Sequence, residues 1–136
     1  MAAALKLNGA ACGLGARDVL RTEMGYPLHG HELSLSISPV EAAASWAVGF
    51  DKQEFTGKAV LVNQKQNGTK LKLKAILATD RAIPRKDMQV KNQTGEVIGT
   101  VTSGTFSPAL RKGIGLALIS SDIKKGDSVV IDVRGR

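Results

Sequence analysis

The sequence predicts a chain of the α+β class, mainly β, in which short helices precede a small antiparallel Greek-key β-barrel. Two observations predict this. Apolar residues recur at helical spacing before Thr69 and alternate with polar residues after it. Five short β-rich segments then follow one another, and none of the connections between them is long enough for a helix that covers a parallel sheet. The length of 136 residues suits one domain, or one domain and a piece of another.

A glycine-rich segment leads into the first expected helix, residues 16–24. Apolar residues recur there every four positions, which is the spacing of one helix face, and Gly25 and Pro27 end the helix. The preceding "GLGARD" lacks the glycine spacing and the lysine of a nucleotide phosphate loop, so that class of site is excluded. We expect Asp18 in the first helical turn, where the helix dipole stabilises its charge, and we assign it a structural role.

Two more short helices are expected before the strands begin. The segment "SPVE" is typical of a capping box, in which Ser38 caps the helix and Glu41 reaches back to the free amide. The alanine-rich turn behind it extends this helix to Trp46. The segment "GKAVLVNQKQNG" forms the third helix, closed by Asn67 and Gly68 in a left-handed cap.

After residue 69 the pattern becomes that of half-buried strands. In "KLKLKAIL" we expect Lys70, Lys72 and Lys74 to point outward, and Leu71, Leu73 and Ala75 to point inward. The further expected strands, separated by turn residues, are "MQVKN", "EVIGTVTSG", "IGLALIS" and "SVVIDVRG". Outward lysines also discourage pairing between the edges of two sheets.

Basic residues are concentrated in the later part of the chain. The net charge is +7; residues 1–50 carry three basic and four acidic side chains, whereas residues 51–136 carry sixteen and eight. Such an excess suits nucleic acid, an anionic cofactor or an acidic protein, or serves solubility alone. Nucleic acid is the weakest candidate, because base stacking needs exposed aromatic residues, and Phe55 and Phe106 stand alone among the basic residues.

Membrane, disulfide and metal chemistry are not predicted. No apolar run reaches the roughly 20 residues that a membrane helix requires, and the first residues lack the features of a cleaved signal peptide. The single cysteine, Cys12, excludes an internal disulfide and suits a reducing compartment. We expect a small buried thiol rather than a nucleophile. His29 and His31 lack a third ligand for zinc, and packing or surface positions are expected for both.

Five segments resemble one enzyme family in their order and spacing. They are "CGLGARDVLRTEMGYPLHGHEL", "SPVEAAASWAV", "FTGKAVL", "AIPRKDMQV" and "IGTVTSGTFSPALRKGIGLALI". Together they resemble the T-protein of the glycine cleavage system, a tetrahydrofolate-dependent aminomethyltransferase, over residues 12–136. The patterns "GARDxLRxExGxPLxGHE" and "VTSGTFSPxLxKxI" carry most of this resemblance.

The resemblance implies a division of the chain. Residues 1–50 would be the end of the folate-binding domain, residues 51–68 a helical connector and residues 69–136 the C-terminal β-barrel, with its last strand missing. The family's catalytic aspartate and pterin-binding glutamate lie in an N-terminal part with no counterpart in this sequence. We therefore expect no catalytic residue here and no activity of this fragment alone. An open barrel edge would favour self-association through edge pairing or exchange of a terminal segment.

The resemblance assigns one residue, Arg17, to the folate site. Arginine offers a rigid fork of donors that suits a carboxylate or a ring carbonyl, and the preceding glycines let the backbone approach closely. The alternative is a salt bridge from Arg17 to Asp18, Glu23 or Glu32. Without the family resemblance, the residues favour that alternative.

Other polar residues are weaker candidates. Lys72 and Lys74 stand where the family often has an Arg-Lys pair near the folate tail, and "KLKLK" matches that pair poorly. Ser103 and Ser107 lack an acid or base partner in sequence reach, and both are expected to form turns.

The implied reaction moves a methylene carbon from the aminomethyl-dihydrolipoyl arm of the H-protein to tetrahydrofolate and releases ammonia. Tetrahydrofolate would be the co-substrate, and the lipoylated H-protein, which is typically acidic, would face the basic residues. The implied location is the bacterial cytoplasm, or the mitochondrial matrix in a eukaryote, with a bacterial source favoured. Two alternatives stay open: a related folate-dependent demethylase, and a basic β-barrel that binds RNA or protein.

Overall fold

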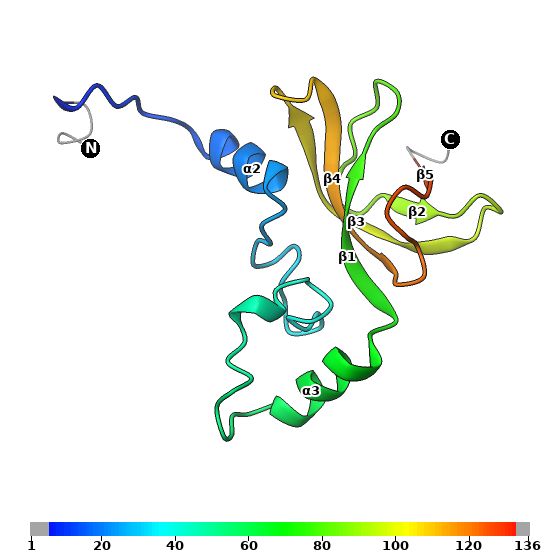
Figure 1. The fold of residues 1–136 in the computed structure, drawn as a ribbon. Coiled ribbons are helices and arrows are strands. Elements are labelled where there is room, and N and C mark those ends of the chain that lie inside the picture. The colour runs from blue at the N-terminus through cyan, green and yellow to red at the C-terminus, as the bar shows by residue number, and fades with distance from the viewer. Residues whose placement is uncertain (1–5, 133–136) are drawn as a thin grey trace.

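The chain folds into a helical N-terminal part and a five-stranded antiparallel sheet (Figure 1). The computed structural model describes residues 6–132. The helical elements are α2 (Leu14–Glu23), the 3-10 turn η1 (Ser45–Ala47) and α3 (Lys58–Asn67). The strands are β1 (Leu71–Leu77), β2 (Gln89–Lys91), β3 (Val97–Ser107), β4 (Lys112–Ser120) and β5 (Val130–Ile131). This content confirms the predicted α+β, mainly β class.

The sheet has Greek-key connectivity, as predicted. Its strand order is β1-β4-β3-β2-β5. Strands β2, β3 and β4 follow one another as antiparallel neighbours, and β1 returns to lie beside β4. Strands β1 and β5 are the two edges of the described sheet. The expected self-association through an open edge stays a prediction.

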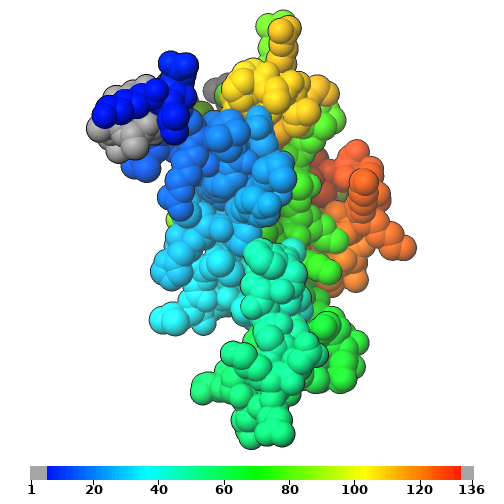
Figure 2. Space-filling model, turned by 60° about the vertical axis from the view of Figure 1, so that its left-hand side comes forward, coloured from blue at the N-terminus to red at the C-terminus, as the bar shows by residue number. Residues whose placement is uncertain are grey.

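Both faces of strand β4, which lies between β1 and β3, are covered. Residues 113–117 are buried without interruption, where a strand covered on one face would alternate. One face belongs to a core of Val90, Val101, Ala117 and Ile119. The other face meets the N-terminal part: α2 contacts β3 and β4, and Figure 2 shows the blue and cyan residues 14–44 lying along the sheet.

The expected orientation of the side chains of β1 is only partly correct. Ala75, expected to point inward, is exposed, whereas Ile76 on the opposite face packs against the core. Lys72 is exposed as expected, but Lys74 is half-buried and donates to the carbonyl oxygens of residues 121 and 123. Simple alternation fails because Leu73 is buried on one face of β1, whereas Ile76 packs against the core on the other face.

The loop between β1 and β2 crosses closely over β3 and β4, and two glycines make this possible. A Cβ atom at Gly104 would lie 2.1 Å from the carbonyl oxygen of Pro84, and one at Gly113 would lie 2.2 Å from that of Ala82. Both distances are far below van der Waals contact. The absence of a side chain at Gly104 and at Gly113 therefore lets the backbone of residues 82–84 pass close to β3 and β4.

Of the three expected helices, two form. Helix α3 ends at Asn67, as predicted, and Gly68 follows with a φ of +80°. Its ψ of 179° is extended, so the expected left-handed cap does not form. The capping box is present, because the Ser38 amide donates to Glu41 and the Glu41 amide donates to Ser38 Oγ. However, Ala43 has a φ of +55°, so a turn followed by the short 3-10 turn η1 replaces the expected continuous helix up to Trp46.

Helix α2 presents its apolar stripe to solvent. The side chains expected to face a core, Leu20 and Met24, are 62% and 66% exposed. The buried residue of the helix is Thr22, and Arg21 is largely buried beside it. A polar face of α2 therefore packs on the sheet. None of the described helices has the length and apolar character needed to cross a membrane.

Candidate functional site

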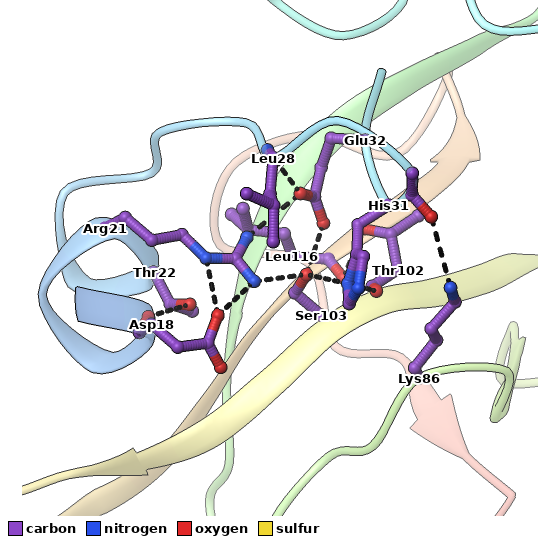
Figure 3. A network of polar contacts seen from close by, with 11 residues as sticks. Asp18, Arg21, Thr22, Leu28, His31, Glu32, Lys86, Thr102, Ser103 and Leu116 are labelled. Atoms are coloured by element: carbon purple, nitrogen blue, oxygen red, sulfur yellow. Dashed lines mark hydrogen bonds and ion pairs between the residues drawn. The ribbon is translucent and has the colours of Figure 1, made fainter. Parts of the chain in front are cut away.

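Arg21 is the centre of a polar network between α2 and β3 (Figure 3). Its side chain is 10% exposed and contacts three groups. Nε donates to Asp18 Oδ1 at 2.8 Å, Nη1 donates to Glu32 Oε2 at 2.9 Å, and Nη2 donates to Ser103 Oγ at 2.9 Å. One guanidinium thus joins its own helix, the turn at residues 28–33 and the sheet.

Glu32 is fully buried, and its charge is compensated from three sides. Besides Arg21, it accepts hydrogen bonds from Ser103 Oγ at 2.6 Å and from the Leu28 amide at 2.9 Å. A buried carboxylate is tolerated only when it is paired and hydrogen-bonded in this way.

Ser103 uses the full hydrogen-bonding capacity of its hydroxyl group. Oγ donates its one proton to Glu32 and accepts from Arg21. His31 Nδ1 lies 3.1 Å from Ser103 Oγ and 3.1 Å from the Thr102 carbonyl oxygen. Because a carbonyl only accepts, Nδ1 must carry a proton, which it shares between the two oxygens.

A β-bulge places Ser103 against α2. The register of β3 on β4 shifts between Val101 and Ser103, which leaves Thr102 without a direct partner in the ladder. Thr102 Oγ1 donates to the Leu116 carbonyl instead. The bulge re-aims Ser103 toward Arg21 and Glu32.

A second contact joins α2 to β3 at the far end of the helix. Ser107 Oγ, fully buried at the end of β3, donates to Glu23 Oε1, and the Leu110 amide donates to the same Oγ. The turn role predicted for Ser107 is confirmed by the bond from Leu110, and the bond to Glu23 adds a tether.

Arg17, the site residue predicted from the sequence, is exposed and unpaired. Within residues 6–132 its guanidinium has no hydrogen-bond or ion-pair partner. The alternative of a salt bridge to Asp18, Glu23 or Glu32 is wrong. Arg21 binds the first and third of these carboxylates, and Ser107 binds the second. Arg17 is therefore a cation free to meet an anionic or carbonyl group.

Comparison with known proteins identifies the family. Residues 1–52 match the GCVT N-terminal domain, and residues 72–136 match the glycine cleavage T-protein C-terminal barrel domain. An aminomethyltransferase of Parafrankia sp. (strain EAN1pec) is 56% identical over 130 residues, which are 96% of this chain and 36% of that protein. The chain belongs to the glycine cleavage T-protein family.

Further T-protein relatives agree in sequence and in fold. The aminomethyltransferase of Mycobacterium tuberculosis (strain ATCC 25618 / H37Rv) is 51% identical over 138 residues, covering 100% of this chain and 37% of that protein. The crystal structure of glycine cleavage system aminomethyltransferase T from Bartonella henselae superimposes with a TM-score of 0.83 at 30% identity, over 91% of this chain and 36% of that one. The chain thus spans little more than a third of the T-protein relatives it matches.

Several expectations for polar residues of this T-protein chain are corrected by the structure. Asp18 lies beyond the first turn of α2 and pairs with Arg21. The ion pair, rather than the helix dipole, therefore stabilises the charge of Asp18. Ser103 is a buried strand residue and does not form a turn. Cys12 is exposed. His31 contacts β3, whereas His29 is on the surface, and both positions agree with the predicted packing or surface roles.

Sequence reasoning missed the network around Arg21. Glu32 and Ser103 are 71 residues apart in the chain. No local pattern indicates such a pairing, and the sequence suggested Glu32 only as an alternative salt-bridge partner of Arg17. The sequence contains one signal of this network. Charged residues stand before and after Gly25, in a segment that is otherwise apolar and rich in glycine.

Proposed function

We propose that this chain supplies the C-terminal part of an aminomethyltransferase of the glycine cleavage system. In the reaction, the methylene carbon of the aminomethyl-dihydrolipoyl H-protein passes to tetrahydrofolate and ammonia is released. The observation that carries this proposal is 51–56% identity to aminomethyltransferases over almost the whole chain. The exposed Cys12 thiol suits a reducing compartment, and we propose the bacterial cytoplasm.

Within this function, Arg17 is proposed to bind tetrahydrofolate. Its guanidinium is exposed, while all three neighbouring carboxylates are engaged elsewhere. An unneutralised guanidinium presents a planar fork of donors to a carboxylate or to a ring carbonyl, both of which folates carry. The residue would orient the acceptor of the carbon rather than take part in bond making.

The basic residues after position 50 are proposed to face the lipoylated H-protein. An acidic carrier would be steered toward this surface, which speeds association more than it raises affinity. Neither Lys72 nor Arg81 is buried, so both are accessible to such a partner.

The first prediction concerns activity. We expect the 136-residue chain alone to release no ammonia above buffer, because the family's catalytic aspartate lies outside the matched third. A hybrid enzyme, in which residues 1–136 replace the matching part of the Mycobacterium tuberculosis relative, is expected to release ammonia when loaded H-protein and tetrahydrofolate are present. A hybrid that is folded by circular dichroism but inactive would contradict the proposed function.

The second prediction concerns Arg17. In the active hybrid, Arg17→Ala should weaken tetrahydrofolate binding about tenfold to a hundredfold, because a charge-assisted hydrogen bond contributes about 1.5–3 kcal/mol. The melting temperature should hardly change, since Arg17 is exposed and has no hydrogen bond or ion pair among the described residues. Arg85→Ala, another exposed arginine, is the matched control. Unchanged affinity, or a large loss of stability, would return Arg17 to a structural role.

A further inference from the structure

Arg17 and Arg21 share one face of α2, because they are four residues apart. Arg21 pairs with the carboxylates of Asp18 and Glu32 at 2.8 and 2.9 Å. Arg17, one turn earlier on the same face, has no such partner among residues 6–132. The helix that Arg21 docks on the sheet therefore carries an unneutralised guanidinium one turn away.

The position of Arg21 depends in turn on Ser103. The hydroxyl group accepts from Arg21 Nη2 at 2.9 Å and donates to Glu32 Oε1 at 2.6 Å. It therefore holds the cation and the anion of the buried pair together. Because Ser103 is on the β-bulge of β3, it also fixes this pair to the sheet rather than to the helix alone.

We propose that Ser103 is a positioning residue for Arg17. Through Arg21 and Glu32 it fixes α2 on the sheet, which holds the free guanidinium of Arg17, one turn away on the same helix, in place for the folate. This inference rests on the proposed role of Arg17 in folate binding. Ser103 itself is buried and would act only through its neighbours.

The binding test uses the hybrid enzyme defined above and measures tetrahydrofolate affinity by calorimetry. Ser103→Ala is expected to weaken binding about threefold to tenfold, the size of one lost neutral hydrogen bond. In an Arg17→Ala background the same change should have no further effect, because Ser103 acts through Arg17. An equal loss in that background, or no loss in either, overturns the inference.

The matched control is Ser107→Ala. Ser107 is also a buried serine of β3 that binds a carboxylate of α2, but it does not contact Arg21. We expect this variant to lose stability and to keep its folate affinity. An equal loss of affinity would mean that tethering of α2 alone suffices, which overturns the specific role of Ser103.

Hydrogen exchange on the 136-residue chain tests the same inference without folate. Ser103→Ala should speed the exchange of the amides of residues 14–21 while those of β4 stay protected. Unchanged exchange in α2 overturns the inference. Should Ser103→Ala fail to fold, Ser103→Cys keeps a polar group at this position, slightly larger, and weakens the hydrogen bonds. If Arg17→Ala leaves folate binding unchanged, the proposed role of Arg17 fails instead, and exchange still decides whether Ser103 positions α2.

Discussion

Gly104→Ala is expected to destabilise the chain by about 3 kcal/mol or more, because overpacking against a rigid neighbour forces backbone shifts. The new Cβ would lie 2.1 Å from the Pro84 carbonyl oxygen and 2.5 Å from its carbon. These are backbone atoms that cannot rotate away as a side chain could. The residues 82–84 would have to leave their place over β3, and the first strand connection would lose its contact with the sheet.

Thermal and denaturant unfolding measure this effect. We expect the melting temperature to fall on the order of 10 °C for a chain of this size. Gly15→Ala is the control, because a Cβ at Gly15 has no neighbour within 4 Å and the residue lies in α2. Alanine there should be neutral or stabilise by up to about 1 kcal/mol. Equal unfolding curves for Gly104→Ala and the wild type would contradict the close approach of the loop.

Arg21→Met is expected to destabilise the chain by about 3–5 kcal/mol, since it leaves the buried Glu32 carboxylate without its cation. Glu32 is 0% exposed and would keep only the Ser103 hydroxyl and the Leu28 amide as partners. The docking of α2 on β3 would be lost with the network.

A double variant separates the ion pair from simple packing. Glu32→Gln combined with Arg21→Met removes both charges and should be more stable than Arg21→Met alone, because no uncompensated charge remains buried. Urea unfolding of the two single variants and the double variant gives the coupling energy. Additive effects would show that the two side chains do not depend on each other.

The local elements were largely predictable from the sequence. The change of hydrophobic period after Thr69 predicted strands, and the turn residues separated them correctly. The end of α3 at Gly68 and the capping box of Ser38 and Glu41 depend only on nearby backbone and side-chain groups. The role of Arg17 in the folate site stays a prediction, implied by the resemblance of the contiguous motif that contains it.

The faces of these elements were less predictable. The apolar stripe of α2 indicated a buried face, yet Leu20 and Met24 are exposed and the polar face meets the sheet. The alternation of β1 was misleading for the same reason, because it presupposes one covered face and Ile76 packs on the other. Hydrophobic periodicity identifies an element, but the neighbours available decide which side is buried.

By itself the sequence determined the order of elements and the Greek-key class, since both depend on patterns of polarity and turn chemistry. Arg17 became a candidate binding residue only through the family resemblance. Only the tertiary structure decided which charges pair. Arg21 rather than Arg17 takes the carboxylates of Asp18 and Glu32, because a bulge in β3 brings Ser103 to Glu32 across 71 residues of sequence. A buried carboxylate needs compensation from every side, and the groups that supply it come together only when the helix is docked on the sheet.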